Sequence, residues 1–224
     1  MRNLGKLFAI EAGDGCGKAT QTKLLFERFQ KEGIPTKMVS FPDYESDSSG
    51  PVRMYLNGDF GNSPNSVNPY AASILYAVDR FASFRKNWKT DYDEGKVILA
   101  DRYATSNLAY QTTKIQDSRE REKFISWIQE LEYEKFGIPI PNIVIYLDID
   151  FDVSERLLTA RMEASGKSDI HESDIKYREM CHQTYQDIAG KLGWIKIRCQ
   201  DEFGNIKPIE EIHEKIYNTV ISFV

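Results

Sequence analysis

Apolar and polar positions follow two patterns along this chain. Five short runs are apolar at consecutive positions, as is typical of strands covered on both faces. Longer segments between them carry apolar residues three and four apart, the spacing of amphipathic helices. Helices between strands indicate right-handed crossovers and therefore a parallel sheet. The predicted strands are Leu7–Glu11, Lys37–Phe41, Val97–Ala100, Asn142–Asp148 and Trp194–Arg198.

Two early helical segments have clear ends. The first runs from Lys18 to Glu32 and stops at a glycine. The second starts at Pro69, is capped by Asn68 and runs to about Lys89. Its apolar stripe is predicted to face the core and consists of Ile74, Val78 and Phe81.

A polar break interrupts the helical pattern late in the chain. Asp152 and Glu155 resemble a capping box for a helix that ends near Met162, and the pattern resumes at Cys181. The Gly-containing break between them is a candidate lid, at about residues 156–172, and a plain surface loop is the alternative.

The last helix is predicted to be purely structural. It spans Pro208 to Phe223 and carries no candidate chemistry. Its single apolar stripe is predicted to be core and consists of Ile209, Ile212, Ile216 and Val220.

Composition fits one soluble globular domain over residues 1–224. Hydrophobic residues make up 41% and charged residues 28% of the 224 residues. The net charge of −5 argues against a nucleic-acid polymer as ligand. The longest apolar run, Ile143 to Leu147, is too short to cross a membrane, and the N-terminus leads directly into the first strand. Three cysteines without C-x-x-C spacing fit a reducing compartment, so we expect a cytoplasmic protein without membrane contact.

The most informative segment is a glycine-rich turn between the first strand and the first helix. Backbone N–H groups of such a turn point at an anion, and the helix N-terminus adds positive potential. Lys18 would reach the outer phosphates, so the segment predicts a nucleoside triphosphate site; an ordinary glycine-rich turn is the alternative. Ala12 and Ala19 depart from the usual pattern, which has glycine and then a hydroxyl residue there. The predicted contacts are Ala12, Gly13, Asp14, Gly15, Cys16, Gly17, Lys18, Ala19 and Thr20.

The segment Asp101–Gln111 is the second strong signal. An acidic residue at the carboxyl end of a strand lies where open α/β sheets bind ligands, and Asp101 there can hold Mg²⁺ through water. Arg102 can grip a phosphate. In the following helix Tyr103, Asn107 and Tyr110 share one face, which suits a nucleoside. A surface helix capped by an Asp–Arg pair is the alternative.

Weaker signals complete a possible pocket. Tyr76 and Arg80 are predicted on one exposed helix face, where a ring and a guanidinium suit a base, although a surface Tyr–Arg stack is the alternative. Phe41 and Pro42 could wall the pocket, and Tyr44 could donate to a phosphate. Basic residues around the lid could reach a transferring phosphoryl group; they are Arg156, Arg161 and Lys167.

Together these motifs resemble those of bacterial thymidylate kinases. That family's E-G-x-D-G-x-G-K-x-T-Q loop is matched by Glu11–Gln21 except at Ala12, and its D-R-Y-x-x-S-N-x-A-Y run is present whole from Asp101 to Tyr110. The segments Phe41–Tyr44, Leu75–Arg80 and Asp169–Glu172 follow in the expected order, so the resemblance covers essentially the full chain. It implies a three-layer P-loop NTPase fold, a five-stranded parallel sheet with a small helical lid, and usually a homodimer.

The resemblance also implies an activity and roles for residues. The family transfers the γ-phosphoryl group of MgATP to dTMP, giving dTDP. Lys18, Arg102, Arg161 and Asp14 would be catalytic, Arg156 and Arg161 would join the loop in binding ATP, and Asp101 and Asp14 would hold Mg²⁺ through water. Asp14 would lie near the sugar 3′-OH, and Tyr110 where a ribose 2′-OH would go. The implied dTMP-binding residues are Asp14, Phe41, Pro42, Tyr44, Tyr76, Arg80, Arg102, Ser106, Asn107, Tyr110 and Gln111.

Two departures from the family bear on these roles. Most members have Phe where Tyr76 stands, and eukaryotic relatives have a basic residue where Cys16 stands, which moves that role to a lid residue, with Arg161 the first choice. The rivals are a kinase for another deoxynucleotide or a deoxynucleoside, and a nucleotide-binding protein without turnover, which Ala12 and Ala19 would favour.

Overall fold

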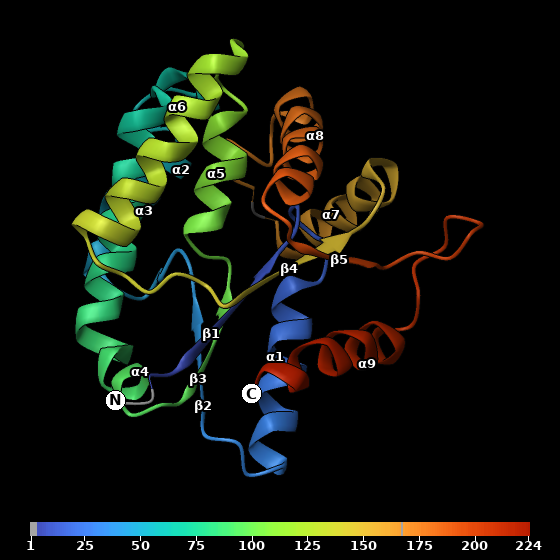
Figure 1. Cartoon of the computed structure of the whole chain (residues 1–224). Helices are drawn as coiled ribbons and strands as arrows, with labels where there is room; N and C mark the ends of the chain where they lie inside the picture. Colours follow the sequence, from blue (N-terminus) through green and yellow to red (C-terminus); the bar gives the residue numbers. More distant parts are fainter. Residues whose placement is uncertain (1–3, 167) are drawn as a thin grey trace.

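A five-stranded parallel sheet forms the centre of the protein. The computed structural model describes residues 4–166 and 168–224. The strand order is β2-β3-β1-β4-β5, and every neighbouring pair is parallel (Figure 1), which confirms the predicted sheet. Each predicted strand ends within one residue of the observed bounds. These are β1 Lys6–Glu11, β2 Thr36–Ser40, β3 Val97–Asp101, β4 Ile143–Asp148 and β5 Ile195–Arg198.

Helices cover both faces of the sheet and give the three layers. On one face lie α1 (Lys18–Lys31) and α9 (Ile209–Val220), which contact each other. On the other face lie α5 (Ala104–Thr112) and the helices around it. Those are α3 (Pro69–Ser83), α4 (Lys89–Asp93), α6 (Ser118–Gln129) and α8 (Ile175–Lys191); α2 (Gly50–Leu56) packs on α3, and α7 (Phe151–Ser165) precedes α8.

Strand β1 shows why consecutive apolar residues were informative. Phe8 and Ile10 belong to the core under α1 and α9, whereas Leu7 and Ala9 belong to the core on the opposite face. All four side chains are fully buried. A strand buried on both faces cannot alternate in polarity, so its continuous apolar run follows from its central place in the sheet.

The stripe predicted on the last helix is correct except at its first residue. Ile212, Ile216 and Val220 are buried against α1, but Ile209 is 51% exposed. Ile209 is the first residue of α9, and the helix begins there at the edge of the α1 contact.

The prediction for α3 was wrong about which face is buried. Ile74, Val78 and Phe81 are exposed, whereas Arg80 is only 2% exposed and Tyr76 is half-buried. The polar side of the helix borders an internal cavity, and Arg80 finds an anionic partner there in Glu132. A charged side chain can be buried when it is paired with an opposite charge. In α3 the polar face is therefore the buried one, whereas the apolar face is exposed.

The helical run that starts at Pro69 is also longer than predicted. It continues from α3 through a π-helical segment, Phe84–Trp88, and into α4, which ends at Asp93. The predicted cap is confirmed, because the Asn68 side chain accepts a hydrogen bond from the N–H of Ala71.

The predicted capping box on α7 does not form. The helix starts at Phe151, and Asp150 at its N-cap makes no side-chain cap but pairs with Arg198. Glu155 pairs with Arg178 instead of reaching back along its own helix. The predicted break is present between Ser165 and Ile175, although Lys167 lies outside the described residues.

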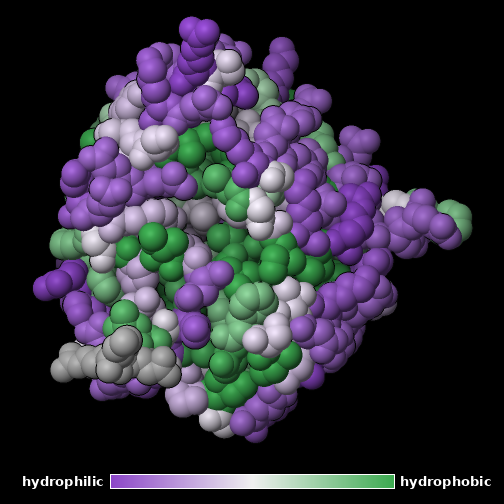
Figure 2. Space-filling model, in the orientation of Figure 1, coloured by the Kyte–Doolittle hydropathy of each residue, from purple (hydrophilic) through white to green (hydrophobic). Residues whose placement is uncertain are grey.

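The surface is mostly polar. Hydrophilic residues cover the rim of the face seen in Figure 1, and apolar residues gather near its centre (Figure 2). The segment between β5 and α9 forms an arm that projects from the body in both views. Within residues 4–166 and 168–224, no helix is long and apolar enough to cross a membrane.

The exposure difference along α9 gives a test of the core. Ile216→Ala should lower the free energy of unfolding by about 2–5 kcal/mol, because it leaves a cavity between α9 and α1. Ile209→Ala, on the same helix but exposed, should change it by less than about 0.5 kcal/mol. Urea denaturation of the two variants measures the difference, and equal losses would show that α9 is not packed as described.

Candidate functional site

The glycine-rich turn that is predicted to bind phosphate directly follows β1 and leads into α1. Gly15 and Gly17 have φ angles of 75° and 77°, in the left-handed region that favours glycine. Ala12 is fully buried and is not among the described residues with positive φ. Its methyl group therefore fits without backbone strain, so the alanine at this position, where the usual pattern has glycine, does not distort the loop.

Gly15 is also required by packing. A Cβ atom there would lie 2.8 Å from Cα of Leu158, so the backbone of α7 rests directly on the loop. The candidate lid therefore begins with a helix that touches the phosphate site.

The Lys18 side chain is buried and hydrogen-bonded to the loop. Its Nζ donates to the carbonyl oxygen of Gly13 at 2.6 Å, and the residue is 7% exposed. Burial, together with the nearby Arg102 guanidinium, lowers the pKa of the Lys18 ammonium. Ala19 and Thr20, in the first turn of α1, are both exposed.

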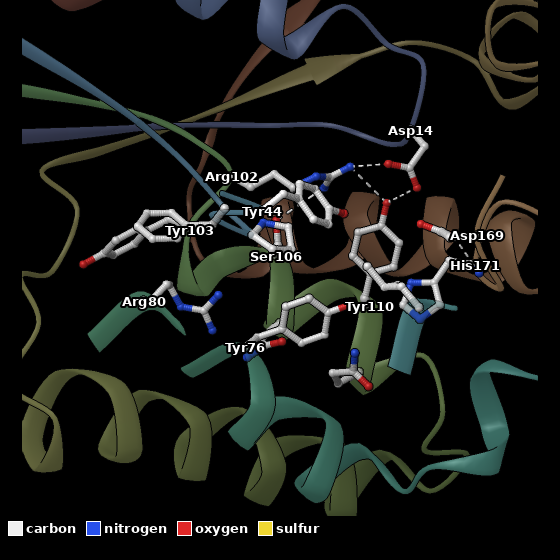
Figure 3. A pocket seen from close by; sticks show the side chains of 15 residues that line it. Asp14, Tyr44, Tyr76, Arg80, Arg102, Tyr103, Ser106, Tyr110, Asp169 and His171 are labelled. Carbon is white, nitrogen blue, oxygen red and sulfur yellow. Dashed lines mark hydrogen bonds and ion pairs between the residues drawn. The ribbon is translucent and has the colours of Figure 1, made fainter. Parts of the chain in front are cut away.

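Asp14, Arg102 and Tyr110 meet at one end of a cavity (Figure 3). Asp14 forms an ion pair with Nη2 of Arg102, and its other oxygen accepts from the Tyr110 hydroxyl at 2.7 Å. Although burial would raise it, Arg102 and Lys18 hold the pKa of the Asp14 carboxyl well below its usual range. Within the described chain Arg102 alone among non-glycine residues has a positive φ, 66°, a conformation that costs about 1–2 kcal/mol.

The cavity has a volume of about 70 Å³ and is lined by the residues predicted to bind the acceptor nucleotide. All eleven residues that the resemblance assigned to dTMP line it, although they come from segments between positions 14 and 111. Leu56, Tyr103, Asp169 and His171 complete the lining.

The end of the cavity away from the loop carries the candidate base contacts. Nε of Arg80 donates to Glu132 at 3.0 Å, and Asn107 donates to the Ser73 carbonyl at 3.2 Å. Gln111 is fully buried, and neither its amide nitrogen nor its oxygen has a partner in the described chain. An unpaired buried amide is costly, so Gln111 has both a donor and an acceptor free for a ligand.

The segment between α7 and α8 forms one side of the cavity, and the sequence had not predicted which of its residues do so. The N–H of Ile170 donates to the Leu56 carbonyl, and Nε2 of His171 lies 2.8 Å from the Tyr55 hydroxyl. The His171 ring stacks on Tyr110. Burial lowers the pKa of His171 to about 3, so the docked ring is neutral.

Arg156 and Arg161 do not line this cavity, and Lys167 lies outside the described residues. Arg161 is 47% exposed and pairs with Glu172, and Arg156 is exposed. Arg178, which the sequence had not singled out, lies beside Gly13 and Asp14 in a second cleft.

Asp101, the predicted Mg²⁺ residue, has a carboxylate without a partner among the described residues. It ends β3, is half-exposed, and its carboxylate accepts no hydrogen bond from the rest of the described chain. Its charge acts on Lys18, which places it near the phosphate loop. Within the described residues, no group of three acidic, His or Cys side chains is placed to hold a metal ion.

Glu11 and Tyr185 are further site residues that sequence reasoning missed. Both are fully buried, and Tyr185 donates to Glu11 at 3.0 Å behind Arg102. An acidic residue directly before a glycine-rich loop was the available signal for Glu11, whereas Tyr185 lies 174 positions away and gave none.

Comparison with known proteins agrees with this geometry. The thymidylate kinase family model matches residues 10–216. Thymidylate kinase of Mycobacterium tuberculosis is 28% identical over 193 residues, covering 84% of this chain and 87% of that protein. A protein of Thermococcus gammatolerans named "Probable thymidylate kinase" is 28% identical over 220 residues, covering 97% and 96%.

The fold is shared with a solved structure as well. The structure of thymidylate kinase from Candida albicans superposes with a TM-score of 0.71 at 19% identity, covering 98% of this chain and 92% of that one. The matched segment contains both the phosphate loop from Ala12 onward and the whole Asp101–Tyr110 run. This chain belongs to the thymidylate kinase family.

Proposed function

We propose that this site transfers the γ-phosphoryl group of MgATP to dTMP, with the residue roles given below. Thymidylate kinase activity follows from the family. The observation that carries the mechanism is the Asp14–Arg102 pair, which joins the phosphate loop to the cavity. A monophosphate in the cavity with its phosphate at Arg102 would lie next to a triphosphate on the loop.

Arg102 is the proposed anchor for the acceptor phosphate. A guanidinium binds phosphate through paired N–H donors, so the phosphate would replace the Asp14 carboxylate at Nη2. Asp14 would then be free to turn to the sugar 3′-OH. Lys18 would leave the Gly13 carbonyl for the transferring group and neutralise charge there.

The far end of the cavity is the proposed base site. Tyr76 would stack on thymine, and Gln111 and Asn107 would present polar groups to its edge. Arg80 would donate to the base while its buried pair with Glu132 fixes its direction. One methyl separates thymine from uracil, so rejection of dUMP should be only about 10–200-fold.

Mg²⁺ is the proposed cofactor, with Asp101 and then Asp14 holding it through water. When bound, the cation would neutralise charge on the phosphates of ATP. Asp101 would hold the water ligands of the cation, and the Lys18 ammonium would donate to the phosphates.

We also propose that residues 156–172 act as the lid on a single domain. α7 rests on the loop at Gly15 through Leu158, so Arg156 and Arg161 are both within one helical turn of that contact. Arg161 would exchange Glu172 for phosphate, with Arg156 as the second candidate. Closure would exclude water from the transferring group.

The exposed stripe on α3 is the proposed homodimer interface. Tyr70, Ile74, Val78 and Phe81 are each 38–42% exposed and spaced four, four and three residues apart, on one face. Tyr70 also packs on Trp127 of α6, so the stripe continues onto a second helix beside α3 (Figure 1). A contiguous apolar surface of this kind marks an interface, and the family usually forms dimers.

The first test is ADP production with MgATP and a panel of nucleoside monophosphates. Turnover should be strongest with dTMP, and Lys18→Ala should lower kcat by about 10²–10³ because one charge on the transferring group is lost. Lys23→Ala, an exposed lysine on the same helix, is the control and should leave kcat unchanged. Near-normal turnover in Lys18→Ala would contradict the role of the loop.

The sugar preference tests Tyr110. The kcat/KM ratio of dUMP to UMP isolates the 2′-OH, because the two differ only there. Tyr110→Ala should lower this ratio by about tenfold or more, corresponding to about 1–3 kcal/mol for a hydroxyl that is no longer blocked. Tyr76→Phe should leave the ratio unchanged, and an unchanged ratio in Tyr110→Ala would refute the gate.

The oligomeric state tests the α3 stripe. Val78→Asp places a charge at its centre and should convert a dimer into a monomer in sedimentation velocity at micromolar concentration. Met180→Asp introduces the same charge at a residue 41% exposed on α8 and should leave the dimer intact. A wild-type protein that sediments as a monomer would contradict the proposal.

A further inference from the structure

Glu11 is a fully buried carboxylate to which the mechanism above gives no part. It is the last residue of β1, directly before the phosphate loop. Its two oxygens accept four hydrogen bonds, from one backbone N–H and three hydroxyl groups. A buried carboxylate whose two oxygens are both hydrogen-bonded is held in one orientation. The groups that it contacts therefore indicate what it positions.

One oxygen of Glu11 holds the start of α5. It accepts from the N–H of Tyr103 at 3.0 Å and from Oγ1 of Thr105 at 2.6 Å. Tyr103 is the N-cap residue of α5 and makes no side-chain cap, so Glu11 supplies a cap from another element. Negative charge near a helix N-terminus is favourable. The backbone directly after Arg102 is thereby tied to β1.

The other oxygen of Glu11 reaches the Arg102 side chain through two hydroxyls. It accepts from Ser106 at 2.6 Å and from Tyr185 at 3.0 Å. The same two hydroxyls accept from Nη1 of Arg102, at 3.4 Å and 3.2 Å respectively. A guanidinium only donates and a carboxylate only accepts, so each hydroxyl must place its proton toward Glu11 and a lone pair toward Arg102.

We propose that Glu11 is a positioning residue that fixes the Arg102 guanidinium for the acceptor phosphate, through the hydroxyls of Ser106 and Tyr185. This rests on the proposed function, in which the phosphate replaces Asp14 at Arg102. Asp14 contacts Nη2, whereas the Glu11 network contacts Nη1. Exchange of Asp14 for phosphate therefore leaves the Glu11 side of Arg102 unchanged and keeps its direction.

Glu11→Gln tests the proposal, because it keeps the shape but removes the charge and replaces an acceptor with a donor. We expect kcat/KM for dTMP to fall at least tenfold while KM for ATP stays within twofold. Tyr185→Phe, which removes one relaying hydroxyl, should lower kcat/KM for dTMP less. The double variant should be no worse than Glu11→Gln alone, because both changes break one path.

Thr105→Val is the matched control. It removes a donor to the other oxygen of Glu11, the one that holds the helix, and Thr105 is also buried. It should lower thermal stability and leave KM for dTMP within twofold. A merely structural role is indicated, and the proposal overturned, if Glu11→Gln affects ATP and dTMP equally, if the effects of Glu11→Gln and Tyr185→Phe add, or if Thr105→Val matches Glu11→Gln.

Two further measurements keep the outcome unambiguous. If Glu11→Gln does not fold, Tyr185→Phe and Ser106→Ala remain, each with Glu11 in place; a selective loss for dTMP supports the proposal and equal losses for ATP and dTMP overturn it. The wild-type substrate panel tests the proposed function separately. If wild type prefers another monophosphate, the same comparison is made with that acceptor. If wild type transfers to none, the affinity for dTMP by calorimetry takes the place of KM.

Discussion

The ion pair between Asp14 and Arg102 is the contact on which the geometry of the site depends. The two residues follow β1 and β3, which are neighbours with Ile10 opposite Asp101, so both loops start side by side at one edge of the sheet. The pair closes the gap between them. Burying two charges is costly unless both are fully hydrogen-bonded, and the surrounding hydroxyls of Tyr110, Ser106 and Tyr185 meet that need. In the proposed mechanism, the acceptor phosphate takes the place of Asp14 at Arg102 and leaves the other contacts unchanged.

The sheet and most of the site could be predicted because their signals are local. A central strand such as β1 must be apolar on both faces, which leaves little freedom in its bounds. The phosphate loop and the Asp101–Tyr110 run each sit at the carboxyl end of such a strand, and parallel strands bring those ends together. The strand order therefore brings Asp14 and the residues of the Asp101–Tyr110 run to one cavity.

The errors occurred where a partner distant in sequence decides which side of an element is buried. The pattern of α3 correctly separated Ile74 and Val78 from Arg80, but a helical period does not say which face turns inward. Glu132, 52 positions later, is the group that makes burial of Arg80 acceptable. In the same way, Asp150 at the start of α7 forms an ion pair with Arg198, and His171, in the segment after that helix, lies at hydrogen-bond distance from Tyr55. None of these pairings has a local signature.

The contact between Gly15 and Leu158 limits how α7 can move. Leu158 lies in the middle of a helix that spans Phe151–Ser165, and its backbone rests on the loop where no side chain intervenes. If this contact is kept, α7 can tilt only about a point near its middle. At a rise of 1.5 Å per residue, Arg156 is about 3 Å along the helix axis on one side of Leu158, and Arg161 is about 4.5 Å on the other side. A tilt toward or away from the loop that keeps the contact moves the two arginines in opposite directions. One then approaches the loop while the other moves away from it.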